Sequence, residues 1–192
     1  MTIELSFTKV SGAGNDFVIV DNRTNSLPED QPALSRALCS RNFGVGADGL
    51  LIIEKSERAH FSMKYFNSDG SYGGMCGNGG RCIARYANMN GIAPKEMSFE
   101  ALDFLYHAKV LGEQVRLTMK DPQNLRRNVE VRVGQDVHTG FFINTGSPHF
   151  VEFVDDVDTV HVEQIGRAVR QDPTLWRLDR KALSGCGHTK GE

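Results

Sequence analysis

Short runs of alternating apolar and polar residues, many of them separated by glycine turns, are the feature that most restricts the fold of this chain. Such alternation is typical of half-buried antiparallel strands, and residues 114–119 show it most clearly. The segments predicted as strands are residues 5–10, 17–21, 49–54, 61–67, 104–111, 114–120, 129–133 and 141–144. The pattern therefore predicts a fold rich in antiparallel sheet.

Helices are predicted at three places among these strands. Residues 30–41 begin with an aspartate that can cap the helix and have a proline near the first turn. Residues 81–89 follow a glycine-rich turn and have one apolar face, and residues 162–170 form a third helical segment. Strands and helices together indicate the α+β class.

The best domain boundary is the polar segment 120–124, which carries a proline and ends a strand. We therefore expect a first lobe over residues 1–122, a partial second lobe over residues 123–174 and a divergent tail over residues 175–192. The tail has no strand alternation and few apolar residues, which is typical of a frayed segment.

Composition excludes several classes of function. The chain has 192 residues, of which 24% are charged, and a formal net charge of -2, so it has no electrostatic footprint for nucleic acid or an anionic membrane. No apolar run approaches membrane-spanning length and the first residues do not resemble a signal peptide, so a cytoplasmic location is expected.

The four cysteines, at positions 39, 76, 82 and 186, include no CxxC pair, and the histidines are scattered. This favours free thiols over disulfides or a metal site.

Cys76 has the most informative surroundings in the chain. It ends the glycine-rich segment 67–76, and a helix is predicted just after it. Free backbone N–H groups at a helix start favour negative charge, whether of a thiolate or of a substrate carboxylate. A cysteine there can act as a nucleophile or a base, and the glycines let the backbone approach a small ligand closely. Cys39 and Cys82, on predicted helices, are interpreted as core residues.

Three further turns have both a plain and a functional interpretation. The turn 12–17 is either a bare connection or offers the amide of Asn15 to a polar substrate group. Asn67, at a strand end, either belongs to a hairpin turn or presents its side chain toward Cys76. His149 follows a Gly-Ser-Pro turn, where it can bind substrate or tune a nearby thiol. The turn 44–49 is interpreted as a helix-to-strand connection.

Taken together, these residues resemble the diaminopimelate epimerase family of cofactor-independent amino-acid epimerases. The matching stretches, in the family's order, are residues 12–17, 44–51, 66–82, 146–149 and 154–158. The resemblance implies two similar lobes, each a mostly antiparallel, barrel-like sheet around a central helix. It also implies interconversion of LL- and meso-diaminopimelate for lysine and peptidoglycan precursors, with one catalytic cysteine from each lobe.

The resemblance also assigns roles to single residues and to partners. It implies no pyridoxal phosphate, no metal and no other cofactor, diaminopimelate as the small-molecule substrate, and a homodimer. The assigned residues are Cys76 as the catalytic acid/base, Asn15, Asn67, Gly77 and Asn78 as substrate contacts, and Gly49, Ser147 and His149 as residues that line the cleft.

The chain departs from the family pattern in its last part. The family's asparagine-rich turn, Glu-Arg pair and Cys-Gly-Ser/Thr-Gly motif are missing, and the sequence around Cys186 does not replace that motif. An incomplete second lobe and a truncated or frameshifted ending are therefore expected. Gly49 stands where some members have a glutamine, and Ser147 stands where many have an asparagine. The alternatives to an active epimerase are a proline racemase-like or phenazine-biosynthesis-like isomerase, and a catalytically dead fragment that at most binds a ligand.

Overall fold

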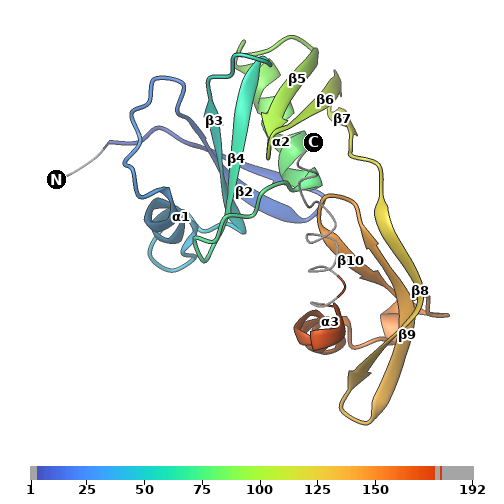
Figure 1. Ribbon diagram of the computed structural model, residues 1–192. Coiled ribbons are helices and arrows are strands. Elements are labelled where there is room, and N and C mark those ends of the chain that lie inside the picture. Colours follow the sequence, from blue (N-terminus) through green and yellow to red (C-terminus); the bar gives the residue numbers. More distant parts are fainter. Residues whose placement is uncertain (1–3, 176–177, 179–192) are drawn as a thin grey trace, which may run out of the picture. The chain divides into compact units, whose positions relative to one another are not determined.

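The computed structural model describes residues 4–175 and residue 178. The chain divides into two compact units, Met1–Met119 and Lys120–Glu192 (Figure 1).

The first unit contains a seven-stranded sheet in which the strands follow one another in chain order. Four of the six neighbouring pairs are antiparallel, and the pairs β2–β3 and β4–β5 are parallel. This confirms the mostly antiparallel sheet, while the two parallel pairs were not predicted. The strands are β1 (Thr8–Gly12), β2 (Asn15–Asp21), β3 (Gly49–Glu54), β4 (Phe61–Asn67), β5 (Glu96–Ala101), β6 (Phe104–Leu111) and β7 (Gln114–Thr118).

Two helices cover opposite faces of this sheet. Helix α2 (Gly77–Met89) contacts strands on both sides of the centre of the sheet, from β1 to β7, because the sheet curves around it (Figure 1). Helix α1 (Gln31–Cys39) contacts β2, β3 and β4, and its first turn is capped by Asp30, whose Oδ1 accepts from the Ala33 N–H at 2.9 Å. Strand β3 is buried on both faces: Leu51 and Ile53 belong to one apolar cluster, and Leu50 and Ile52 to the other. This explains its continuous apolar sequence.

The described part of the second unit contains a three-stranded antiparallel sheet with an α-helix packed against it. Its strands are β8 (Gln123–Val133), β9 (Asp136–Asn144) and β10 (Pro148–Val151), in the order β10-β9-β8. A short 3-10 turn, η1 (Val157–Thr159), precedes helix α3 (Val162–Gln171), which contacts β8. Val131, Phe142 and Val169 meet in its core, so the helix predicted over residues 162–170 is confirmed.

Two predictions about the first unit need correction. Helix α2 begins at Gly77 and not at residue 81, although three of its first four residues are glycines, which are poor helix formers. Close packing explains Gly80, because a Cβ there would stand 2.8 Å from Met75 Cε and 2.9 Å from Leu117 Cδ2. Strand β5 was missed, although Met97 and Phe99 alternate with exposed or half-buried neighbours.

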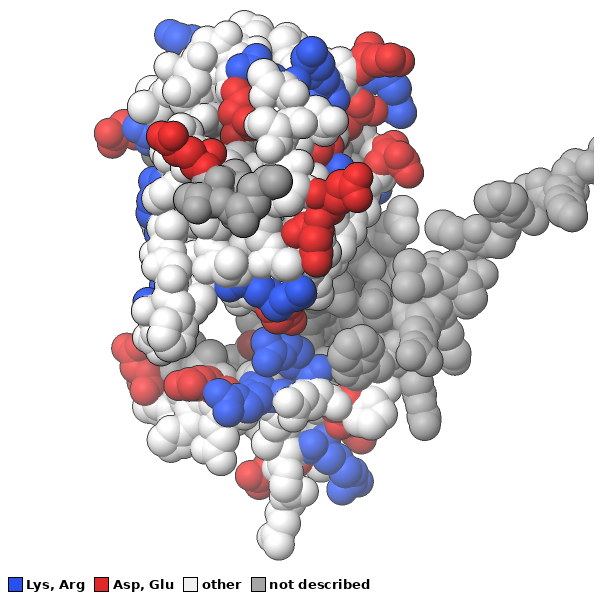
Figure 2. Space-filling view, turned by 90° about the vertical axis from the view of Figure 1, so that its left-hand side faces the viewer, with Lys and Arg blue, Asp and Glu red and all other residues white. Residues whose placement is uncertain are grey.

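Two further observations concern the charge on the surface and the length of the helices. Figure 2 shows acidic and basic side chains interspersed on one face of the molecule. None of the helices in the described part of the chain has the length and apolar character needed to cross a membrane.

Candidate active site around Cys76

Cys76 is the N-cap residue of helix α2. Its backbone is extended (φ -126°, ψ 122°), and its Sγ accepts a hydrogen bond from the Gly79 N–H at 3.4 Å. The carbonyl of Cys76 accepts from the Gly80 N–H at 2.7 Å, which closes the first turn of the helix. The thiol is half-buried and stands where the unpaired N–H groups of the helix favour negative charge.

Two predicted substrate residues, Asn15 and Asn78, contact each other directly. The Asn78 Nδ2 donates to Asn15 Oδ1 at 2.7 Å, joining the start of β2 to the first turn of α2. Asn15 Nδ2 in turn donates to Asp48 Oδ2 at 3.0 Å, and Asn78 Oδ1 accepts from Arg81 Nη2. These two asparagines therefore form the middle of a polar chain beside Cys76.

Charged side chains anchor this polar chain on the side of Asp48. Arg41 donates to Asp48 Oδ1 at 2.8 Å and to Asp16 Oδ1 at 3.0 Å, and Lys9 pairs with Asp16 Oδ2 at 2.7 Å. Arg41 and Lys9 hold the pKa of Asp16 well below its usual range through these hydrogen bonds. Asp16 therefore stays ionised near neutral pH and holds the Arg41 side chain next to Asp48.

Asn67 has partners of its own at the end of β4. Its Oδ1 accepts from the Tyr65 hydroxyl at 2.7 Å, and its Nδ2 donates to Ser71 Oγ at 2.9 Å. Burial, with a smaller contribution from the nearby charge of Cys76, raises the pKa of Tyr65 to about 12. The phenol therefore keeps the proton that it donates to Asn67 throughout the physiological range.

Glycines make room for the Tyr65 ring. A Cβ at Gly49 would overlap the ring at Cε2 and stand 2.6 Å from the Phe66 carbonyl oxygen. A Cβ at Gly73 would overlap the same ring at Cδ1 and Cε1. The structure thus places Gly49 at the start of β3, buried beside Tyr65, where its missing side chain makes the close approach possible.

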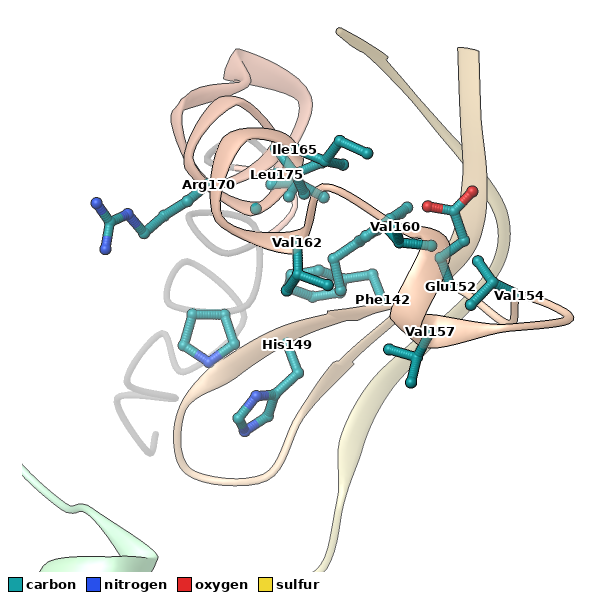
Figure 3. A pocket seen from close by; sticks show the side chains of 14 residues that line it. Phe142, His149, Glu152, Val154, Val157, Val160, Val162, Ile165, Arg170 and Leu175 are labelled. Carbon is teal, nitrogen blue, oxygen red and sulfur yellow. The ribbon is translucent and has the colours of Figure 1, made fainter. Parts of the chain in front are cut away.

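The other two predicted site residues, Ser147 and His149, lie in the second unit. The Ser147 carbonyl accepts from the Thr145 N–H at 3.0 Å in the turn between β9 and β10, and His149 Nε2 lies 3.1 Å from Thr145 Oγ1. His149 borders an apolar pocket of about 640 Å³ between the sheet and α3 (Figure 3). Phe142, Val162 and Ile165 are among its walls.

Sequence reasoning missed three residues of the Cys76 region: Asp48, Tyr65 and Arg81. Asp48 was assigned to a simple connection and Tyr65 to an ordinary strand position. The partner of Asp48 in the polar chain, Asn15, lies 33 residues away on another element, so no local pattern indicates that contact. Two contacts are local: Tyr65 with Asn67, two residues apart on β4, and Arg81 with Asn78, at a helical spacing of three residues.

The accessibility of the cysteines predicts selective alkylation. Cys39 and Cys82 are only 2% and 8% exposed, as the sequence predicted, and burial raises the pKa of both thiols. Because the thiolate is the reactive form, a raised pKa lowers their reactivity at a given pH, in addition to the steric protection. We expect iodoacetamide at pH 8 to modify Cys76 first in the folded protein, as measured by peptide mass spectrometry.

This experiment should use the Cys186→Ser variant, because the fourth thiol lies outside the described residues and would react independently. Denatured protein provides the control, in which Cys39, Cys76 and Cys82 should react at similar rates. Modification of Cys39 or Cys82 as fast as Cys76 in folded protein would contradict the burial of these two thiols.

Comparison with solved structures identifies the fold. The chain is similar to a Bacillus anthracis phenazine biosynthesis protein of the PhzF family, with a TM-score of 0.61 and 16% identity, over 86% of this chain and 62% of the other. It is similar to a probable proline racemase from Agrobacterium radiobacter K84, with a TM-score of 0.60 and 16% identity, over 85% and 53% of the two chains. The expected fold class is confirmed: this is the α+β fold that these proteins share.

Sequence comparison identifies the family. The family model described as diaminopimelate epimerase matches residues 7–138. The chain is 41% identical over 175 residues to the diaminopimelate epimerase of Hydrogenobaculum sp. (strain Y04AAS1), covering 85% of this chain and 63% of that protein. With the enzyme of Chlorobaculum tepidum it shares 42% identity over 172 residues, covering 87% and 64%. The chain belongs to the diaminopimelate epimerase family, and it spans about three fifths to two thirds of the length of these relatives.

Proposed function

We propose that this chain supplies the Cys76 half of a diaminopimelate epimerase site. The observation that carries the proposal is the position of Cys76: a half-buried thiol at the N-terminus of α2, next to paired asparagines, in a member of this family. The proposed substrate is diaminopimelate, an amino acid with two stereocentres that each carry an ammonium and a carboxylate. Family membership also supports a cytoplasmic location and a homodimer as parts of this proposal.

The proposed chemistry is proton transfer at the α-carbon. The Cys76 thiolate takes the α-proton, so that the C–H bond breaks, an S–H bond forms and the electron pair stays on the substrate, delocalised into its carboxylate. In the reverse direction the Cys76 thiol returns the proton. Inversion needs a second acid on the opposite face, because one group cannot reach both faces of a held carbon. The N–H groups at the start of α2 would stabilise the carboxylate as negative charge develops.

Asn15, Asn67, Asn78 and the backbone of Gly77 are the proposed substrate contacts of this half. Each asparagine side chain is held by a partner within the first unit, so the site is organised before the ligand arrives. Such preorganisation matters here because an amino-acid α-proton is weakly acidic and its removal needs strong charge stabilisation. Ser147 and His149 are the proposed cleft-lining residues.

The second candidate function is ligand binding without inversion. It is favoured by the cysteines of the described residues, because Cys39 and Cys82 are buried and leave Cys76 as the one half-buried thiol there. Cys186, at a position outside the described residues, is the one further cysteine that follows His149 in the sequence.

Incubation with LL- or meso-diaminopimelate in heavy water separates these functions. Deuterium uptake at the α-carbon is followed by mass spectrometry, and inversion by chiral chromatography, for wild type and Cys186→Ser. Uptake with inversion supports epimerase activity, and its loss in Cys186→Ser assigns Cys186 as the second acid. Uptake by one stereocentre without inversion supports a one-base site at Cys76. If neither uptake nor protection of Cys76 from iodoacetamide occurs with either isomer, both functions are refuted; protection alone supports ligand binding.

A further inference from the structure

The polar chain beside Cys76 has a charged group at each end. One of these groups can only accept hydrogen bonds, and the other can only donate them. Asp48 ends it with a carboxylate, which only accepts hydrogen bonds, and Arg81 ends it with a guanidinium, which only donates. Between them, each asparagine amide has one donating and one accepting side. The whole chain therefore has a single direction, from Arg81 through Asn78 and Asn15 to Asp48.

This direction fixes how both amides are turned. If the Asn15 amide were reversed, its oxygen would face the Asp48 carboxylate and its NH₂ would face the donating NH₂ of Asn78. If the Asn78 amide were reversed, its NH₂ would face the Arg81 guanidinium. Either reversal sets acceptor against acceptor or donor against donor, which loses two hydrogen bonds and adds repulsion.

We propose that Asp48 and Arg81 are positioning residues that set the orientation of the Asn15 and Asn78 amides in the ligand-binding site. Each amide keeps a second N–H that no residue in the described part of the chain accepts, and the fixed orientation directs this donor consistently. The inference rests on the proposed function for the ligand, whereas the orientation itself is a property of the free protein.

The location of Arg81 supports a positioning role over a purely stabilising one. A positive charge near the N-terminus of a helix opposes the helix dipole, and the first turn of α2 contains no acidic residue to compensate it. The two carboxylate oxygens of Asp48 have different partners. Oδ1 accepts from Arg41, and Oδ2 accepts from Asn15 Nδ2 and from the Asp16 N–H. Its carboxylate thus connects the ion pairs of the surface to the amide chain.

The test compares Asp48→Ala with Asp21→Ala. Both variants remove an ion-paired carboxylate from the first unit, since Asp21 pairs with Arg23, but only Asp48 contacts Asn15. The readout without ligand is the ¹H–¹⁵N spectrum of the side-chain amides, with the two signals assigned through Asn15→Ala and Asn78→Ala. We expect Asp48→Ala to shift the signal of Asn15 and also that of Asn78, although Asp48 and Asn78 share no hydrogen bond. Asp21→Ala should leave both signals in place.

Arg81→Met supplies the same test from the opposite end and should shift the Asn15 signal through Asn78. This variant removes the guanidinium from a half-buried helix position and leaves the sheet intact, so it keeps the test decisive if Asp48→Ala fails to fold. A folded protein in which neither end substitution moves the signal of the remote asparagine would overturn the proposal.

The second readout is ligand binding. The concentration of diaminopimelate that halves the alkylation rate of Cys76 should rise about tenfold in Asp48→Ala and stay unchanged in Asp21→Ala. Unchanged protection in Asp48→Ala would refute the role of Asp48 in ligand binding. If diaminopimelate does not slow the alkylation of wild-type Cys76, the binding part of the proposed function fails. The amide spectra of the free protein then decide alone whether the orientation of the Asn15 and Asn78 amides is set from the two ends.

Discussion

Replacement of Cys76 by alanine is expected to lower deuterium uptake at the α-carbon of diaminopimelate by about 10² to 10⁴-fold, the usual range for loss of a general acid/base. No other cysteine among the described residues can substitute for it, because Cys39 and Cys82 are buried in apolar clusters. The measurement is the initial rate of α-deuteration, by mass spectrometry, relative to wild type at the same pH.

Cys39→Ala is the matched control for this substitution. It removes a thiol of the same unit whose nearest polar partner is Ser35 Oγ at 3.7 Å, and it should leave the deuteration rate unchanged. Uptake at the wild-type rate in Cys76→Ala, or a comparable loss in Cys39→Ala, would show that Cys76 is not the proton-transfer group.

Substitution of Gly49 by alanine is expected to lower the free energy of unfolding by about 3 kcal/mol. The new methyl group would overlap the ring of Tyr65 and stand 2.6 Å from the backbone carbonyl of Phe66, which cannot rotate away. Urea unfolding followed by circular dichroism measures the shift of the midpoint. The displaced phenol should also lose its hydrogen bond to Asn67, so ligand affinity should fall as well.

Gly77→Ala is the control for Gly49→Ala in the stability measurement. A Cβ at Gly77 would meet Arg81 Nη1 at 3.6 Å and Met119 Sδ at 3.8 Å, which are ordinary contacts, and alanine favours the helix more than glycine does. We expect its midpoint to equal or exceed that of wild type. Gly49→Ala with a wild-type midpoint would mean that β3 and β4 can separate without cost.

Local patterns in the sequence predicted much of the first unit. The N-cap of α1, the burial of Cys39 and Cys82, and the glycine-rich approach to Cys76 all depend on neighbours within a few residues. The start of α2 was placed too late because its glycines argue against a helix, and the packing against Met75 and Leu117 that explains Gly80 is not visible in the local sequence.

Features that depend on distant contacts could not be predicted. The parallel pairing of β2 with β3 follows from the path of the chain through α1, not from the alternation within either strand. The same applies to the contacts of Asn15 with Asp48 and with Asn78. Asn15 was identified as a polar group at a turn, but its orientation is decided by Asp48 and Asn78, which reach it from two other elements.

Gly49 has a consequence for how the strands align during folding. Strand β3 is apolar on both faces, so a slip of one residue against β4 would still bury apolar side chains, and hydrophobicity alone discriminates poorly between the two alignments. A slip that brought Leu50 to the place of Gly49 would drive an isobutyl group into the Tyr65 ring. The one residue without a side chain thus excludes the shifted alignment, and the correct one keeps Asn67 paired opposite Gly49.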